Sequence, residues 1–164
     1  MKYSVVIPVF NSVNSLVDLA DRIRNVFENI SPDSFEIIYV DDNSQNPLTW
    51  KTLSELRSRG YVKAVRLTRN FGQQPATICG MEMATGDYVI TMDDDGQHAP
   101  EDIPLLLALS NHDVVIGEFH DKKHNLFKIT TSWLKGKFDE AILGKPKNLN
   151  LSSFRLFNRA TVTG

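Results

Sequence analysis

Short apolar runs alternate with amphipathic segments along most of the chain. Runs rich in Val, Ile and Tyr predict buried strands at Tyr3–Phe10, Phe35–Val40, Val62–Leu67, Asp87–Met92 and Val114–Ile116. Apolar residues spaced three and four positions apart predict helices between these strands, at residues 13–30, 48–59, 74–84 and 101–109. Because the strands are almost continuously apolar and alternate with helices, we expect an α/β fold with a mainly parallel central sheet and helices on both faces.

The pattern changes after about Phe119. Basic and aromatic residues mix over Asn125–Leu143, which we expect to form a basic helix, and Leu149–Phe157 is expected to contain one more strand. There is no internal repeat and no linker. We therefore expect one domain with two parts, an α/β core at 1–118 and an incomplete second region, beginning with the basic helix, at 119–164.

Composition narrows the class of protein. The 164 residues suffice for one domain, and 41% hydrophobic residues exclude a disordered or collagenous chain. The single Cys79 excludes an intramolecular disulfide, and no apolar run reaches the roughly 18 residues that a membrane span needs. Residues 1–118 carry a net charge of −8, which suits a cation site. Residues 119–164 carry a net charge of +6, which suits binding to phosphates or to an anionic membrane surface.

Candidate chemistry lies at three predicted strand ends, where ligands of open α/β sheets bind. These ends read Pro8-Val9-Phe10-Asn11, Asp41-Asp42-Asn43-Ser44 and Asp93-Asp94-Asp95-Gly96-Gln97-His98. Three consecutive carboxylates repel one another, and a divalent cation such as Mg²⁺ would compensate them. In extended backbone Asp93 and Asp95 point to the same side and form the better ligand pair. The alternative is a solvent-exposed acidic turn that caps the next helix.

Other chemistries lack support in the sequence. No G-x-G-x-x-G or G-x-x-x-x-G-K-[ST] motif is present, which argues against dinucleotide and P-loop enzymes. The four histidines have no zinc-like spacing; His98 is either a further metal ligand or a loop histidine that covers the helix start. Cys79 lies on a predicted buried face and is expected in the core.

Four segments resemble glycosyltransferase family 2, whose members have the Rossmann-like GT-A fold. They are VVIPVFNS at 5–12, EIIYVDDNS at 36–44, RNFGQQPATICGMEMATGDYVITMDDDGQHAPEDIP at 69–104, and SSFRLFNR at 152–159. The third is the most specific and resembles the polyprenyl-phosphate branch, of the dolichol-phosphate-mannose-synthase type.

The resemblance implies roles for individual residues. Pro8, Phe10, Asp41 and Asp42 would surround the base and ribose of a nucleotide-sugar donor, in a donor pocket that also includes Asn11, Arg69, Asn70, Gly72 and Asp94. Asp93 and Asp95 would form the DxD motif that holds Mg²⁺ or Mn²⁺ against the donor diphosphate, with Gln97 as a further ligand. Arg155 would lie near the acceptor phosphate.

The chain also departs from the family pattern. Ser12 stands where Glu is common, no arginine lies near Phe119, and Asn150, Ser152 and Ser153 replace residues that are often acidic. No carboxylate can be assigned as a general base. Family members continue beyond the position of Gly164, so we expect the natural protein to continue too, into further helices and often membrane spans.

The resemblance implies a metal-dependent glycosyltransferase that moves a sugar from a UDP-, GDP- or dTDP-type donor, with inversion, to a polyprenyl phosphate. Such an acceptor is already anionic at neutral pH and needs little or no base. A cytoplasmic location at the membrane face is expected, with contact to the membrane surface through the basic helix and no nucleic-acid partner.

Three alternatives remain open at this point. One is a hydroxyl-directed glycosyltransferase of surface polysaccharide synthesis, and another is a non-catalytic nucleotide-sugar-binding domain. The third is a receiver-type signalling domain with a Mg²⁺-binding acidic pocket. It is disfavoured because the acidic pair Asp41-Asp42 follows the second predicted strand, and no lysine ends the fifth.

Overall fold

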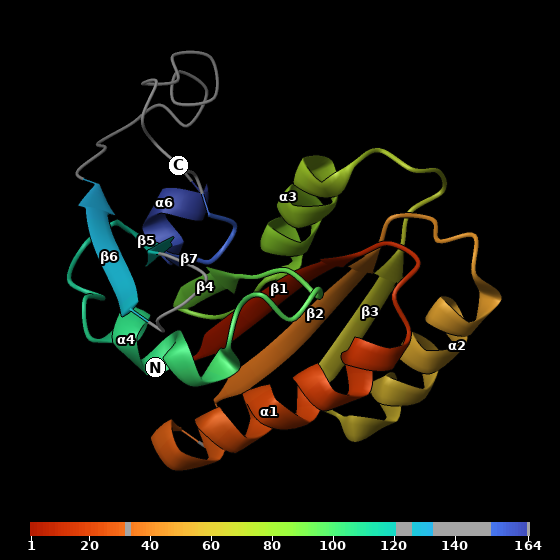
Figure 1. The fold of residues 1–164 in the computed structure, drawn as a ribbon, viewed down its shortest axis with the longest axis horizontal. Coiled ribbons are helices and arrows are strands. Elements are labelled where there is room, and N and C mark those ends of the chain that lie inside the picture. Colours follow the sequence, from red (N-terminus) through yellow and green to blue (C-terminus); the bar gives the residue numbers. More distant parts are fainter. Residues whose placement is uncertain (32–33, 121–125, 133–151, 164) are drawn as a thin grey trace.

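A computed structural model describes residues 1–31, 34–120, 126–132 and 152–163, and Figure 1 shows their arrangement. These residues form a seven-stranded sheet in the order β3-β2-β1-β4-β7-β5-β6. The strands are β1 (Tyr3–Val9), β2 (Phe35–Asp41), β3 (Val62–Arg66), β4 (Tyr88–Thr91), β5 (Val114–His120), β6 (Leu126–Ser132) and β7 (Arg155–Asn158).

The first four strands form a parallel sheet, because β1 pairs in parallel with β2 and β4, and β2 pairs in parallel with β3. The last strand, β7, enters between β4 and β5 and is antiparallel to both. Strand β6 then pairs antiparallel with β5. The expected division at 118/119 falls inside β5. A mainly parallel sheet with antiparallel additions confirms the predicted α/β class.

Helices cover both faces of this sheet, as predicted (Figure 1). The larger core joins one face to α1 (Asn14–Ile30), α2 (Pro47–Leu56) and α4 (Ile103–Leu107). The smaller core joins the other face to α3 (Gln73–Met83) and α6 (Arg159–Thr163). Short 3₁₀ turns at Arg57–Arg59 and Pro100–Asp102 complete the described elements.

Local sequence explains why these helices form where they do. Helix α1 buries one stripe of apolar residues at three- and four-residue spacing, namely Leu16, Leu19, Ala20, Ile23 and Phe27. Helix α2 has Pro47 in its first turn, and the Asn46 side chain caps it by accepting a hydrogen bond from Leu48 N at 3.0 Å.

The predicted basic helix at Asn125–Leu143 is wrong over residues 126–132, which form strand β6. Every residue of β6 lies in register with β5, from Val114↔Ser132 to His120↔Leu126. The β-branched run Ile129-Thr130-Thr131 favours a strand, and pairing with β5 outweighs the helical spacing. Residues 125 and 133–143 of that prediction lie outside the described residues.

The last predicted strand, within Leu149–Phe157, is found as β7 at Arg155–Asn158, while residues 149–151 lie outside the described residues. Among the helices that the structure describes, none has the length and apolar character needed to cross a bilayer.

Candidate functional site

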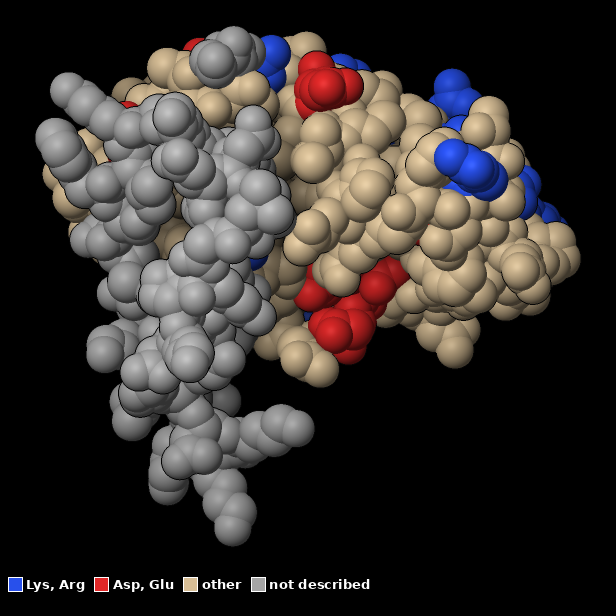
Figure 2. All heavy atoms as spheres, turned by 90° about the horizontal axis from the view of Figure 1, so that it is seen from above, with Lys and Arg blue, Asp and Glu red and all other residues tan. Residues whose placement is uncertain are grey.

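The carboxyl ends of β1, β2 and β4 meet at an open cleft of about 310 Å³. Its lining consists of the end of β1, residues that follow the three strands, and the loop that leads into the first residue of α3: Pro8, Val9, Phe10, Asp42, Asn70, Gly72, Gln73, Asp93, Asp94 and Asp95. Most of the predicted donor residues share one cleft with two of the three predicted metal ligands, Asp93 and Asp95, whereas the third, Gln97, does not line it. Figure 2 shows acidic side chains gathered in a hollow of the surface.

The side chains that line the cleft give it a negative charge. Its lining includes four carboxylates, from Asp42, Asp93, Asp94 and Asp95, and no Lys or Arg from the described residues. A site of this charge repels a bare diphosphate and attracts cations.

Asp42 fixes the loop that leads into α3. Its Oδ1 accepts a hydrogen bond from Phe71 N at 2.7 Å, and its Oδ2 accepts one from Gly72 N at 2.8 Å. Gly72 has φ +95°, a left-handed conformation that favours glycine. The side chain of Asp42 thus shapes the wall of the cleft as well as lining it.

Asp41 lies beneath the cleft, with a fully buried side chain. Its Oδ1 accepts a hydrogen bond from Ser44 N at 2.8 Å, and its Oδ2 lies 3.3 Å from Arg66 Nε. The structure therefore places Asp41 in the support of the loop after β2, next to but not within the cleft lining.

Asn11 and Arg69 also lie outside the lining. Asn11 has φ +61°, and its Oδ1 accepts hydrogen bonds from Gln45 N and Asn46 N, so it joins the loops that follow β1 and β2. The Arg69 guanidinium lies 4.6 Å from the ring centre of Phe71.

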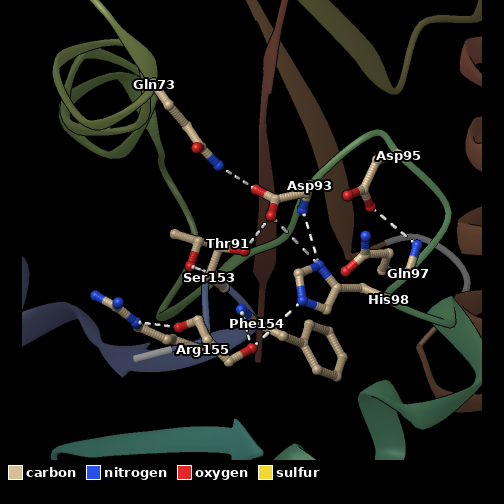
Figure 3. A network of polar contacts seen from close by, with 10 residues as sticks. Gln73, Thr91, Asp93, Asp95, Gln97, His98, Ser153, Phe154 and Arg155 are labelled. Atoms are coloured by element: carbon tan, nitrogen blue, oxygen red, sulfur yellow. Dashed lines mark hydrogen bonds and ion pairs between the residues drawn. The ribbon is translucent and has the colours of Figure 1, made fainter. Parts of the chain in front are cut away.

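Asp93 is held from several sides (Figure 3). Gln73 Nε2, from the start of α3, donates to Oδ1 at 2.5 Å, and the Ser153 hydroxyl donates to Oδ2. The backbone N of Asp93 donates to His98 Nδ1 at 3.1 Å. Both the side chain and the backbone of this predicted metal ligand are thereby oriented.

His98 ends the acidic loop, which consists of residues 93–98, and its side chain is buried against the segment before β7. Its ring stacks on Phe154 with 5.4 Å between ring centres, and its Nε2 lies 3.3 Å from Ser152 Oγ. Burial lowers the pKa of His98, and the carboxylates of Asp93 and Asp95 only partly oppose this shift. Because Nδ1 accepts the Asp93 N–H, the structure supports the loop-histidine alternative over a metal ligand.

The other two carboxylates differ in exposure. Burial raises the pKa of Asp94, as do Asp95 and Asp93, while a hydrogen bond with Ser12 lowers it. Among the described residues, Asp94 Oδ2 is buried without a hydrogen-bond partner. Asp95 is exposed, and its Oδ1 accepts a hydrogen bond from Gln97 N at 2.9 Å.

These residues fit a hard divalent cation by their chemistry, because they offer carboxylate oxygens in a cleft to which the described part of the chain contributes no basic side chain. The described residues contain no preformed group of three or more His, Cys, Asp or Glu side chains that could hold a metal ion. The protein would therefore supply part of the shell, and Mg²⁺ commonly completes such a shell with substrate phosphates and water.

Arg155 begins β7, in register with Thr91 of β4 and Ile116 of β5. Its Nε donates to Ser152 O at 2.7 Å, and its guanidinium points away from Asp93 in Figure 3. Burial lowers the pKa of Arg155, although Asp93 opposes the shift. The predicted acceptor residue thus lies beside the acidic loop.

No sequence pattern predicts the contacts of Gln73 and Ser153 with Asp93. They join residues 20 and 60 positions apart, a separation that leaves no local pattern. What the sequence does show is that both residues lie in segments that carry the family resemblance. Gln73 directly follows Gly72 in one segment, and Ser153 directly precedes Phe154 in another.

The chain is similar to curated proteins of known activity. A dolichol-phosphate mannosyltransferase of Pyrococcus furiosus is 40% identical over 124 residues, which cover 74% of this chain and 34% of the relative. The chain thus spans about a third of that relative's length.

Two solved structures share the fold. S. aureus TarS 1–349 superposes with a TM-score of 0.63 at 19% identity, covering 98% of this chain and 48% of that one. The mannosyltransferase PcManGT from Pyrobaculum calidifontis, solved with GDP-Man and Mn²⁺, has a TM-score of 0.52 at 21% identity, covering 62% and 29%. The model of Glycosyl transferase family 2 matches residues 4–162. With its DxD residues in a cleft of a GT-A sheet, the chain belongs to glycosyltransferase family 2.

Proposed function

We propose that this chain forms the donor site of a cation-dependent glycosyltransferase that transfers a sugar, with inversion, from a nucleoside-diphosphate sugar to a polyprenyl phosphate. The donor side comprises residues 1–118, and the acceptor side begins within 119–164. Because the acceptor is a lipid, we place the whole protein at the cytoplasmic face of a membrane.

One observation carries the cation requirement. The cleft presents four carboxylates and no basic side chain from the described residues, so a diphosphate needs a cation to enter it. Asp93 and Asp95 would hold Mg²⁺ or Mn²⁺, with Gln97 next to them. When bound, the cation offsets the negative charge that develops on the departing diphosphate. The Mn²⁺ and GDP-Man in PcManGT agree with this proposal.

The remaining cleft residues suit the nucleoside. Phe10 lines the cleft with 46% of its surface exposed, and its ring offers an apolar face to a base. Pro8, Asn70 and Gly72 form the adjoining part of the cleft wall. Asp94 would offer a carboxylate oxygen to a hydroxyl group of the donor. The Asp41 and Asn11 side chains hold the loops on which this wall rests.

On the acceptor side, the Arg155 guanidinium would bind the lipid phosphate. A phosphate oxygen forms the new bond to the anomeric carbon, while the bond from that carbon to the donor β-phosphate oxygen breaks and the nucleoside diphosphate leaves. A single displacement inverts the anomeric centre. The acceptor oxygen is already ionised, so no general base is needed. The 40% identical relative is a dolichol-phosphate mannosyltransferase, which supports this acceptor class.

Calorimetric titration tests the donor half of the proposal. UDP, GDP and dTDP are each titrated with and without Mn²⁺ into the wild type, the Asp93→Ala/Asp95→Ala variant, and a control, Asp18→Ala, on the exposed face of α1. We expect one nucleotide to bind with Mn²⁺ to the wild type and the control only. Equal binding without Mn²⁺, or by the double variant, would contradict the proposal.

Transfer assays test the acceptor half. The full-length protein is given a labelled donor of the base so identified, and either a polyprenyl phosphate or a glycan with free hydroxyls. We expect label on the lipid, and a loss with Arg155→Met that Arg155→Lys partly restores. Label on the glycan would indicate a hydroxyl-directed enzyme, and binding without transfer would indicate a nucleotide-sugar-binding domain.

A further inference from the structure

Asp93 receives its two side-chain hydrogen bonds from elements that belong to opposite sides of the proposed reaction. Gln73 Nε2 reaches Oδ1 from the first residue of α3, on the donor side. The Ser153 hydroxyl reaches Oδ2 from the segment before β7, two residues from Arg155. Each carboxylate oxygen therefore has one neutral donor (Figure 3).

The segment that carries Ser153 is itself attached to the acidic loop. The Thr91 hydroxyl donates to Ser153 O at 2.6 Å, and Ser152 Oγ lies 3.3 Å from His98 Nε2. The Phe154 ring stacks on His98. Ser153 is thus not a loose surface hydroxyl, because its backbone is fixed by the strand and loop that also carry Asp93.

Gln73 and Ser153 face a carboxylate that must present its remaining lone pairs to a cation. Each carboxylate oxygen can accept a hydrogen bond and still bind a metal ion. Outer partners of this kind orient metal ligands, and their loss commonly weakens metal affinity about 10- to 100-fold. Neutral donors on both oxygens add no charge that would compete with the cation.

We propose that Gln73 and Ser153 are positioning residues for the cation site: together they fix the Asp93 carboxylate, and Ser153 ties the acceptor-side segment to the donor-side cation. This inference rests on the proposed function, since it assumes that Asp93 binds a divalent cation with the donor.

Cation affinity tests this inference directly, without an activity assay. Free Mn²⁺ is measured by electron paramagnetic resonance during titration of the full chain at a fixed saturating concentration of UDP, GDP or dTDP. The variants are Gln73→Met and Ser153→Ala, which remove one hydrogen-bond donor each, and Ser153→Thr, which keeps the hydroxyl. Gln74→Met is the matched control, because Gln74 is exposed and does not line the cleft.

We expect Mn²⁺ affinity to fall about 10-fold in Gln73→Met and in Ser153→Ala, with wild-type affinity in Gln74→Met and recovery in Ser153→Thr. The free energy of unfolding in urea should stay close to the wild-type value in Gln73→Met, a change at an exposed position, which separates positioning from general damage. Circular dichroism confirms folding, and exposed Gln73 keeps the test valid if Ser153→Ala misfolds.

Two results would overturn the inference. The first is Mn²⁺ affinity that falls in Asp93→Asn but stays at the wild-type value in both Gln73→Met and Ser153→Ala. This result would keep Asp93 as a cation ligand and remove the positioning role of Gln73 and Ser153. No Mn²⁺ binding by the wild type with any of the nucleotides would remove the proposed function together with the inference.

Discussion

Asp42 Oδ2 accepts a hydrogen bond from Gly72 N at 2.8 Å, and this contact links the end of β2 to the start of α3. The same carboxylate accepts a second bond from Phe71 N. Asp42→Asn turns one acceptor into an NH₂ group that faces a backbone N–H. We expect a loss of about 1–3 kcal/mol in the free energy of unfolding, measured by urea denaturation.

Nucleotide affinity should fall in the same variant, because the contact sets the wall of the cleft. Asp18→Asn, on the exposed face of α1, is the control and should leave both quantities unchanged. Unchanged stability in Asp42→Asn would show that the 71–72 backbone finds other acceptors.

Gly80 lies on the buried side of α3, packed against Val6 of β1 and Val40 of β2. A Cβ at this position would lie 2.4 Å from Val6 Cγ1 and 3.0 Å from Val40 Cγ2. We expect Gly80→Ala to cost about 1–3 kcal/mol by overpacking, reduced by about 1 kcal/mol from the higher helix propensity of alanine.

A double-mutant cycle identifies the cause of that loss. Val6→Ala makes room at the contact, so Val6→Ala/Gly80→Ala should be more stable than the sum of the single changes predicts, by about 1 kcal/mol. Gln74→Ala, at an exposed position of the same helix, is the control. Additive effects would argue against the contact.

Glu36 should make the free energy of unfolding depend on pH. Burial raises the pKa of its carboxyl, but hydrogen bonds from Lys63, Ser4 and Thr85 outweigh this effect and hold the pKa at about 2, below the ordinary value of 4.5. Its contribution is present in full above pH 4.5 and is lost as pH falls toward 2. The loss should amount to about 3 kcal/mol.

Urea unfolding between pH 7 and pH 2.5 measures how the free energy of unfolding changes with pH. The change should be present in the wild type and should largely disappear in Glu36→Gln. Glu28→Gln, an exposed change on α1, should keep it. A wild-type slope in Glu36→Gln would assign the acid sensitivity to other carboxyl groups.

His98→Phe separates ring packing from hydrogen bonding. Phenylalanine preserves an aromatic surface next to Phe154 but leaves Asp93 N–H without its ring acceptor and Ser152 without its ring partner. We expect a loss of about 1–3 kcal/mol in the free energy of unfolding, measured in urea. Stability equal to the wild type would show that packing alone is the role of this ring.

The parts of the fold that could be predicted from sequence are those with local patterns. Strands β1 to β5 and helices α1 to α4 follow from runs and spacings of apolar residues, and the acidic ends of β2 and β4 indicated the cleft. Strand β6 was mistaken for a helix because Leu126, Phe127 and Ile129 also fit helical spacing. Pairing with β5 decides between the two, and pairing is not a local property.

The supporting contacts of the site were less accessible to prediction. Asp41 and Asp42 adjoin in sequence and were expected to act alike. Both are buried, but the Asp41 carboxylate accepts from Ser44 N within its own loop, whereas the Asp42 carboxylate accepts from the backbone of residues 71 and 72. The Gln73 and Ser153 contacts with Asp93 depend on α3 and β7 meeting the same loop. Only the three-dimensional arrangement shows this.

The position of β7 has a consequence for how the protein is made. Among the described strands, β5 joins the four parallel strands through β7 alone. The pairing of β7 with β4 spans about 70 residues, from Tyr88 to Asn158. During translation the β5–β6 hairpin has no place in the sheet until residue 158 has left the ribosome. The amino-terminal sheet can thus form early, but the edge of β4 remains open to wrong partners until β7 has been synthesised.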